Sequence, residues 1–361
     1  MTVTVLNADV LDGLRSLPDA AFGVVVTSPP YWGLRDYGTP GQMGLEPTLG
    51  EHLERMVEVF AEVHRVLKDD GVLWVNYGDC YATTPNGRSA ADTKAAGNDD
   101  RTFRDKPFST IQGALKPKDL CMVPNRFAIA MQEWGWWVRS EIIWAKPNPM
   151  PESIKDRPAT AHEKIFMFTK AARYWYDAEA VRQSMAQSSV ERLAQNVEAQ
   201  AGSTRANGGA KTNGPMKAVG GDKQRGHSRR HAGFNDGWDA MDRDEQRANG
   251  RNLRNYEPAP VQVWEIPTRG FKAAHFATFP PELVARCLRA SLRAGDAVLD
   301  PFGGSGTTGL VADKFGADAT LIEINPDYCA LIRSRLAAGL VELDNRAAPT
   351  ELGGLFARAA E

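Results

Sequence analysis

The stretch VLDPFGGSGTTG, residues 298–309, lies between an apolar run typical of a buried strand and a segment typical of a helix. Glycines in such a turn let the backbone come close to a ligand, and the first turn of a helix offers unpaired N–H groups. The spacing is neither the dinucleotide fingerprint G-x-G-x-x-G nor a phosphate-binding loop followed by Gly-Lys-Ser/Thr. The stretch therefore predicts a strand–turn–helix unit that binds a ligand, without naming the ligand.

A carboxylate about twenty residues further on gives this turn a partner. Glu323 ends the next expected strand, residues 318–324. A carboxylate at that position can accept hydrogen bonds from both ribose hydroxyls of an adenosine cofactor. Glu323 alone could equally be a solvated strand end, but its spacing from the glycine-rich turn favours ribose binding.

The amino-terminal part alternates strands and helices in the same way. Residues 3–7, 22–27 and 72–77 read as strands, and residues 10–17 read as a helix. A longer helix, expected to end at Asp70-Gly71, is indicated by apolar residues at helical spacing: Leu53, Met56, Val57, Phe60, Val63 and Leu67. This order argues for an α/β fold with a parallel sheet and crossover helices.

The remaining expected elements continue that pattern. Helices are expected at residues 125–134, 281–292, 307–315 and 327–338, and strands at residues 136–146, 164–169 and 297–301. Residues 83–118 are polar and long for a connection, so we expect a mobile surface loop.

Length and charge bound the class of protein. The chain has 361 residues and a net charge of −2, which suits one large α/β domain with a smaller insertion and excludes a polycation. The four cysteines are too far apart in sequence for a zinc site and suggest no disulfide framework, so we expect reduced thiols and no metal. The amino terminus lacks a signal core, and no apolar run approaches the ~18 residues of a membrane span. We therefore expect a cytoplasmic protein without a membrane partner.

Residues 184–255 change character, because Gln, Asn, Gly, Ser and Ala dominate there. Within residues 201–235, seven basic residues stand against the single acid Asp222. Such composition is typical of a disordered linker, and it also suits a segment that orders on phosphates. The two interpretations are compatible, and both are kept.

The second informative stretch is TSPPYW, residues 27–32, directly after the expected strand at residues 22–27. A turn needs at most one proline, yet two prolines stand here and two aromatic residues follow them. The prolines fix the backbone and have no N–H of their own. The stretch predicts that a flat group lies on the rings that follow.

TSPPYW resembles the catalytic motif of DNA amino-methyltransferases, (Ser/Asp/Asn)-Pro-Pro-(Tyr/Phe/Trp), and DPFGGSGTTG resembles their S-adenosylmethionine loop. The catalytic motif precedes the cofactor loop, as in the circularly permuted β group of these enzymes. Similar segments are Asn7-Ala8-Asp9, PNPMPES, HEKIFMFTK and HFATFP at residues 275–280. The resemblance implies a Rossmann-like methyltransferase fold, circularly permuted, with an inserted target-recognition region.

The resemblance also implies domain boundaries. Residues 1–183 would be the catalytic part and residues 256–345 the cofactor-binding part of one methyltransferase domain. Residues 184–255 would be the target-recognition insertion, and residues 346–361 a carboxyl-terminal tail.

The implied catalytic residues are Ser28, Pro29, Pro30 and Tyr31. The Ser28 hydroxyl and the Pro29 carbonyl would accept hydrogen bonds from the target amine, and Tyr31 would stack on a flipped base. The implied cofactor-binding residues are Asp9, His275, Phe276, Thr278, Phe279, Asp300, Phe302, Gly303, Gly304, Ser305, Gly306 and Glu323.

Several of these roles have ordinary alternatives. Asp9 could cap a helix instead of meeting the cofactor adenine. Asp300 could position the turn or meet the cofactor's amino group. Trp32 fits either a pocket wall or the core, and His162 with Glu163 could be an acid/base pair, although a structural or pocket-lining role is favoured.

In this family, Ser before Pro-Pro favours cytosine N4 as the target, and adenine N6 is the alternative. No cysteine follows a proline, as attack on cytosine C5 would require, which argues for an amine target. Double-stranded DNA is the implied partner, and a homodimer and a cognate restriction endonuclease are compatible further partners. The candidate DNA contacts are Arg205, Lys211, Arg225, Arg229, Arg230, Arg251 and Arg254.

Three other functions compete with this one. A nucleotide-binding oxidoreductase would explain the glycine-rich turn and Glu323 but gives Ser-Pro-Pro-Tyr no task. A methyltransferase acting on RNA or protein glutamine more often carries Asn before Pro-Pro. A catalytically silent DNA-binding module predicts DNA binding without methyl transfer.

Overall fold

The computed structural model describes residues 2–34, 36, 39–83, 108–149, 151–181, 261–268 and 279–339. The chain divides into two units, Met1–Val181 with Val261–Glu361, and Arg182–Pro260. The described residues all belong to the first unit. The expected insertion and carboxyl-terminal tail, and with them the seven candidate DNA contacts, lie outside the described residues.

One mixed sheet forms the centre of the first unit, with the strand order β1-β8-β7-β2-β3-β5-β4-β6. Neighbouring strands from β1 to β3 in that order are parallel, β5 is antiparallel to β3 and β4, and β6 is parallel to β4. The strands are β1 (Val3–Asn7), β2 (Phe22–Thr27), β3 (Leu67–Tyr77), β4 (Trp137–Ala145), β5 (His162–Thr169), β6 (Val263–Glu265), β7 (Ala297–Asp300) and β8 (Ala319–Glu323). The expected parallel sheet is thus confirmed for five strands, and an antiparallel pair extends it.

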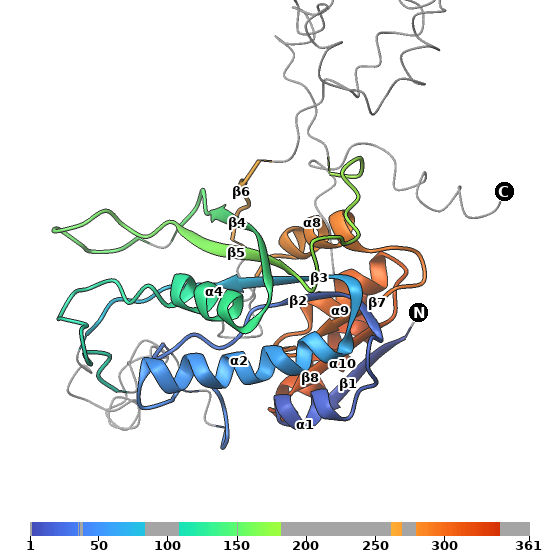
Figure 1. Ribbon diagram of the computed structural model, residues 1–361, viewed down its shortest axis with the longest axis horizontal. Coiled ribbons are helices and arrows are strands. Elements are labelled where there is room, and N and C mark those ends of the chain that lie inside the picture. Colours follow the sequence, from blue (N-terminus) through green and yellow to red (C-terminus); the bar gives the residue numbers. More distant parts are fainter. Residues whose placement is uncertain are drawn as a thin grey trace, which may run out of the picture. The chain divides into compact units, whose positions relative to one another are not determined.

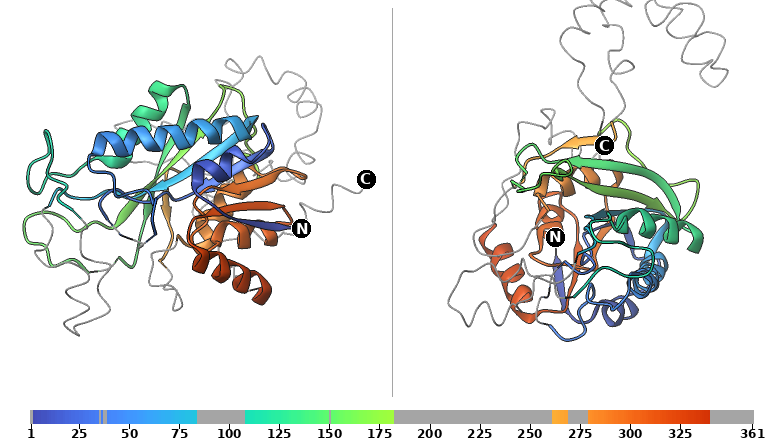
Figure 2. Two further views of the ribbon diagram at one scale, coloured as in Figure 1. Left: turned by 90° about the horizontal axis from the view of Figure 1, so that it is seen from below. Right: turned by 90° about the vertical axis from the view of Figure 1, so that its left-hand side faces the viewer.

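Helices cover both faces of this sheet (Figures 1 and 2). On one face lie α1 (Val10–Arg15), α2 (Leu49–Val66) and α4 (Val123–Trp134), and on the other lie α8 (Pro281–Ser291), α9 (Thr307–Lys314) and α10 (Pro326–Ala338). Each face has its own apolar core, one around Phe60 and Phe127 and the other around Trp74 and Val284. Among the described helices, none is both long enough and apolar enough to cross a membrane.

Local sequence explains the central elements. Every residue of β2, FGVVVT, is buried, as expected of a strand covered on both faces. Helix α2 begins with a capping box in which Thr48 and Glu51 bond each other's backbone N–H groups. Its apolar side packs on the sheet through residues such as Met56 and Val63.

Helix α2 ends earlier than the sequence indicated. We expected it to reach Asp70-Gly71, but it stops at Val66, and β3 starts at Leu67 with a bulge opposite β2. Both Asp70 carboxylate oxygens bond the guanidinium of Arg293, at 2.6 and 3.0 Å, in the segment that leads into β7. This ion pair lowers the pKa of Asp70. The residues expected to end the helix thus belong to β3, and Asp70 makes a contact distant in sequence.

The end of the expected mobile loop, residues 108–118, is described and has contacts with the core. The Thr110 side chain is fully buried, its backbone N–H donates to the Thr83 carbonyl at 3.0 Å, and its hydroxyl accepts from the Thr83 N–H at 3.0 Å. Phe108 packs on Trp32, with ring centroids 5.8 Å apart. Ile111 and Leu115 also pack on the first core, while residues 84–107 lie outside the described part, so the expected mobility stays a prediction.

The topology places two turns side by side at one edge of the sheet. Strands β2 and β7 are parallel neighbours, but β2 leads through α2 to β3 on one side, whereas β7 leads through α9 to β8 on the other. In open α/β sheets, ligands bind outside the carboxyl ends of strands at such a point of divergence. We call residues 28–34, after β2, the proline turn, and residues 300–306, after β7, the glycine turn.

Candidate active site

Asp300, at the start of the glycine turn, forms a hydrogen bond with Thr27, the residue directly before the proline turn. Its Oδ1 accepts from the Thr27 hydroxyl at 2.7 Å and from the Phe302 N–H at 3.0 Å, and its Oδ2 lies 2.7 Å from the Thr308 hydroxyl. Thr27 and Asp300 are 273 positions apart in the chain. Because both oxygens are engaged within the chain, the structure supports the turn-positioning role for Asp300.

Burial sets the charge of this carboxyl. Asp300 is only 1% exposed, and burial raises its pKa to about 7, although the hydrogen bonds from Thr27 and Thr308 act in the opposite direction. The negative charge of Glu323 raises the pKa further. The Asp300 carboxyl, which links the two turns, therefore changes its charge near neutral pH.

The glycine turn is bound to the end of β8. The Gly304 N–H donates to Oε2 of Glu323 at 2.8 Å, and the Asn325 N–H donates to Oε1 at 2.9 Å. Burial raises the pKa of Glu323. Phe302 packs on the core beside the turn, and the carbonyl of the buried Ser305 accepts from the Arg335 guanidinium.

Gly306 shows why this turn needs glycine. Its φ is 80°, and a Cβ at this position would lie 2.9 Å from the side chain of Ile332 on α10. Gly303 also passes close to β8, where a Cβ would meet the Ile322 carbonyl at 3.3 Å. The glycine turn thus packs tightly between β8 and α10, and it presents mainly backbone groups to a ligand.

The other expected cofactor residues are only partly placed. Asp9 is the N-cap of α1, and its Oδ1 accepts from the Leu11 N–H at 2.9 Å, so the capping role is observed. Its predicted contact with adenine stays a prediction. Phe279 is half-buried against the second core. His275, Phe276 and Thr278 lie outside the described residues.

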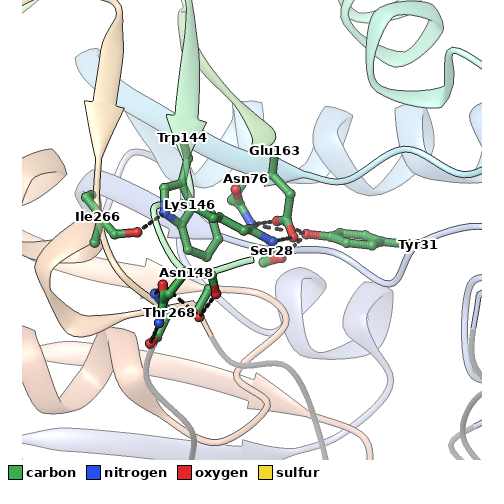
Figure 3. A network of polar contacts seen from close by, with 9 residues as sticks. All are labelled: Ser28, Tyr31, Asn76, Trp144, Lys146, Asn148, Glu163, Ile266 and Thr268. Carbon is green, nitrogen blue, oxygen red and sulfur yellow. Dashed lines mark hydrogen bonds and ion pairs between the residues drawn. The ribbon is translucent and has the colours of Figure 1, made fainter. Parts of the chain in front are cut away.

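The proline turn carries a network of polar side chains, shown in Figure 3. Tyr31 Oη donates to Oε2 of Glu163 at 2.8 Å and lies 3.3 Å from Oγ of Ser28. Asn76, at the end of β3, directs Nδ2 to the same Glu163 oxygen at 2.8 Å, to Tyr31 Oη at 3.1 Å and to Ser28 Oγ at 3.4 Å. Three strand ends thus converge on Ser28 and Tyr31.

Lys146 completes this group from β4's carboxyl end. Its ammonium pairs with Oε1 of Glu163 and lies 4.5 Å from the ring centroid of Trp144. Trp144 is held by a 2.8 Å bond from its indole N–H to the Ile266 carbonyl after β6. We call Ser28, Tyr31, Asn76, Lys146 and Glu163 the polar cluster.

The structure resolves two alternatives left open by the sequence. Trp32 is 1% exposed, and its indole N–H donates to the Glu46 carbonyl at 3.0 Å, so Trp32 is a core residue. Consecutive strand residues point to opposite faces. His162 is exposed while Glu163 reaches Tyr31, so Glu163 lines the site and the two do not form an acid/base pair.

Comparison with known proteins decides the family. A family model described as DNA methylase matches residues 22–334, a span that includes both turns and the polar cluster. The chain belongs to the DNA methylase family. Membership confirms the predicted enzyme class and S-adenosylmethionine as the cofactor, and it sets aside the oxidoreductase interpretation.

Named relatives of this DNA methylase are type II methyltransferases. Type II methyltransferase M.XycI of Xanthomonas campestris pv. cyanopsidis is 41% identical over 333 residues, which cover 92% of this chain and 87% of that protein. Type II methyltransferase M.Cfr9I of Citrobacter freundii gives the same identity and the same coverage. These matches extend over nearly the whole length of both relatives.

A solved structure supports the fold. The PvuII DNA methyltransferase, described as cytosine-N4-specific, has a TM-score of 0.56 with 18% sequence identity, covering 95% of this chain and 88% of that one. The Rossmann-like fold expected from the sequence is thereby confirmed. Assignment to the permuted subgroup stays a prediction.

The glycine turn of this DNA methylase fits an adenosine cofactor. Each Glu323 carboxylate oxygen accepts one backbone N–H and keeps a further lone pair, to which a pair of ribose hydroxyls would donate. The tight passage at Gly306 keeps side chains out of that approach. The polar cluster stands at the neighbouring strand end, where a group to be methylated would meet the cofactor.

Proposed function

We propose that this DNA methylase transfers a methyl group to the N4 amine of a cytosine flipped out of double-stranded DNA. Serine precedes the two prolines, which in this family favours cytosine, and the PvuII enzyme with the same fold is described as cytosine-N4-specific. The observation that carries the proposal is the polar cluster, in which Ser28 and Tyr31 stand together beside the glycine turn.

The residues of the proline turn suit a weak nucleophile. The lone pair of the amine is delocalised into the base, so the amine must be held in line and drawn toward a tetrahedral geometry. Ser28 Oγ and the Pro29 carbonyl would accept its two N–H bonds. Pro29 and Pro30 have no N–H group to compete for these acceptors, and their rings fix the backbone.

S-adenosylmethionine supplies the methyl group on a positively charged sulfur. As the nitrogen took up this methyl, Ser28 Oγ and the Pro29 carbonyl would keep accepting its N–H bonds until one proton passed to solvent. Glu163 would place negative charge behind Ser28 and Tyr31 while the nitrogen becomes positive. Lys146 pairs with the other carboxylate oxygen and holds this group in place.

Tyr31 would stack on the extruded base and restore part of its lost stacking. The 2.8 Å bond to Glu163 restrains the ring at its hydroxyl end, and Gly78 leaves room for the ring, because a Cβ there would lie 2.5 Å from it. The basic residues of the insertion would contact the duplex, mostly at phosphates. A second copy of the chain and a cognate restriction endonuclease remain predicted partners.

Nucleoside mass spectrometry tests the proposal. The full chain is incubated with unmethylated genomic DNA and S-adenosylmethionine, and the DNA is digested to nucleosides. N4-methylcytosine is the expected product. N6-methyladenine instead would keep the enzyme class but overturn cytosine as the target, and neither product on double- or single-stranded DNA would overturn both.

A further inference from the structure

Behind the proline turn lies a second group of polar side chains, which the chemistry above does not use. His52 on α2 places Nδ1 2.7 Å from Oε2 of Glu46 and Nε2 2.5 Å from the hydroxyl of Tyr77 at the end of β3. His52 and Tyr77 are fully buried, and Glu46 is 9% exposed. We call Glu46, His52 and Tyr77 the buried triad.

Proton positions in the triad follow from its partners. Burial raises the pKa of Tyr77 well above its usual value, so the phenol keeps its hydrogen. Burial also acts to raise the pKa of Glu46, but the hydrogen bond and charge of His52 outweigh it, and the pKa is lowered. His52 thus has a polar partner at each ring nitrogen, the Glu46 carboxylate at Nδ1 and the Tyr77 hydroxyl at Nε2.

This triad reaches the proline turn along two routes. The first is ring packing: the Tyr77 and Tyr31 ring centroids are 5.4 Å apart and tilted by 45°. The second runs through Glu46, whose Oε2 accepts from the Gly44 N–H at 2.9 Å, while the Gly44 carbonyl accepts from the Gly33 N–H at 2.9 Å.

The backbone at Glu46 adds a third restraint on the same turn. Its carbonyl accepts the indole N–H of Trp32, the residue that directly follows Tyr31. Gly44 also passes so close that a Cβ there would lie 3.1 Å from the Tyr31 carbonyl. The Tyr31 ring is therefore restrained by Tyr77, and its backbone by the segment from Gly44 to Glu46.

We infer that Glu46, His52 and Tyr77 are positioning residues, which fix the Tyr31 ring at the height and angle needed for the target base. The inference rests on the proposed stacking role of Tyr31. It adds α2 and the segment around Gly44 to the parts of the fold on which turnover depends. His52 and Tyr77 are fully buried and Glu46 is 9% exposed, so we expect loss of the triad to slow methyl transfer while both ligands still bind.

The test removes one hydroxyl. Tyr77→Phe deletes the bond to His52 and keeps the ring against Tyr31. The matched control is Tyr176→Phe, which removes a partly buried hydroxyl from a residue packed on the other apolar core. Each full-length variant is assayed for single-turnover methylation of unmethylated genomic DNA, KM for that DNA, and the rise in melting temperature caused by S-adenosylhomocysteine.

We expect Tyr77→Phe to slow the single-turnover step by roughly ten- to a hundredfold, with the KM and the melting-temperature rise unchanged. Tyr176→Phe should keep the wild-type rate. His52→Gln retains an amide near the position of Nε2 and should recover part of the rate lost in His52→Ala. This graded recovery distinguishes positioning from general loss of stability.

Two results distinguish a failure of the positioning role from a failure of the proposed stacking role of Tyr31. If Tyr31→Ala abolishes methylation while Tyr77→Phe and His52→Ala keep the wild-type rate, the positioning role is wrong and the stacking role stands. If Tyr31→Ala itself methylates at the wild-type rate, the proposed stacking role is wrong. A loss in Tyr77→Phe that merely follows a lowered melting temperature, with no recovery in His52→Gln, also overturns the inference.

Discussion

The proline turn and the glycine turn occupy equivalent places, each at the carboxyl end of one of two neighbouring parallel strands, yet they are built on opposite principles. The proline turn has a stiff backbone and presents side chains, which Asn76 and Glu163 bind from adjoining strands. The glycine turn presents backbone and is fixed by carboxylates, Asp300 on one side and Glu323 on the other.

Under the proposed function, the difference follows from what each turn would hold. A large cofactor needs close approach and backbone donors, so side chains there are an obstacle. A small amine needs a few acceptors at fixed positions, so side chains and their supports matter. Single substitutions should therefore affect turnover at the proline turn and cofactor binding at the glycine turn.

The largest effect is expected at the proline turn. Ser28→Ala and Tyr31→Ala should each lower the methylation rate by about a hundredfold or more, because they remove an acceptor and a stacking surface. The rise in melting temperature caused by S-adenosylhomocysteine should persist. Ser16→Ala, at the end of α1, is the control and should keep full activity. Loss of cofactor binding in Ser28→Ala would contradict the expectation that the proline turn affects turnover and not cofactor binding.

The next effect is expected at the glycine turn. Gly306→Ala combines a positive φ with a Cβ only 2.9 Å from Ile332 and should cost roughly 2–4 kcal/mol of unfolding free energy and weaken S-adenosylhomocysteine binding. Gly295→Ala has a similar φ, 83°, and no atom within 4 Å of its Cβ. It should cost about 1 kcal/mol and leave cofactor binding intact. Denaturant unfolding and calorimetry measure both quantities, and equal losses would show that the clash is unimportant.

A smaller effect should appear at the support of the proline turn. Glu163→Gln leaves Lys146 without its counter-charge and removes negative charge from the site, so turnover should fall about tenfold. Adding Lys146→Met should recover stability but not rate. The matched control is Glu141→Gln, because Glu141 on β4 pairs with Lys164 at 2.6 Å. A steady-state assay that finds equal rates for Glu163→Gln and Glu141→Gln would remove Glu163 from the mechanism.

The smallest expected effect is on the pH dependence of stability, through Asp300, which links the two turns. The pKa of Asp300 is raised to about 7, so its favourable contribution to stability is fully present at low pH and is lost as pH rises through 7. Asp300→Asn stays neutral, so the melting temperature of the wild type should fall relative to this variant as pH rises from 5 to about 8. Thermal unfolding across that range measures the difference.

Asp296 is the contrasting control for this experiment. Its hydrogen bonds with Arg293 and Lys68 outweigh burial and lower its pKa, so its contribution is present at neutral pH and lost only in acid. Asp296→Asn should therefore differ from the wild type by a constant amount between pH 5 and 8. A wild-type curve parallel to that of Asp300→Asn would mean that Asp300 is charged throughout.

The sequence predicted the turns better than their surroundings. Glycine, proline and strand periodicity are local signals, and they located both turns and most strands. The antiparallel extension by β5 and β4 was not predicted, because pairing between distant strands leaves little local pattern. The end of α2 was misplaced because Leu67 already pairs with Phe22 of β2, a contact that is also distant in sequence.

The site was predictable where a motif carried it. Asn76 could have been identified, because it lies at the end of an expected strand whose carboxyl edge the fold directs to the site. Lys146 had only its position before PNPMPES as a signal. The buried triad has no motif, since Glu46, His52 and Tyr77 meet only after α2 packs on the sheet.

The strand order has a consequence for how the enzyme could diverge. The sheet is built from two stretches of the chain, one before residue 182 and one after residue 260. Strands β8 and β7 of the second stretch lie between β1 and β2 of the first, so strands of the two stretches alternate in the sheet. Neither stretch can complete the sheet alone, and the Thr27–Asp300 bond joins them at the ends of β2 and β7. The predicted target-recognition insertion, residues 184–255, lies between these two stretches in sequence. If that prediction holds, exchange of the insertion between relatives should change the DNA sequence recognised and keep both stretches of the sheet.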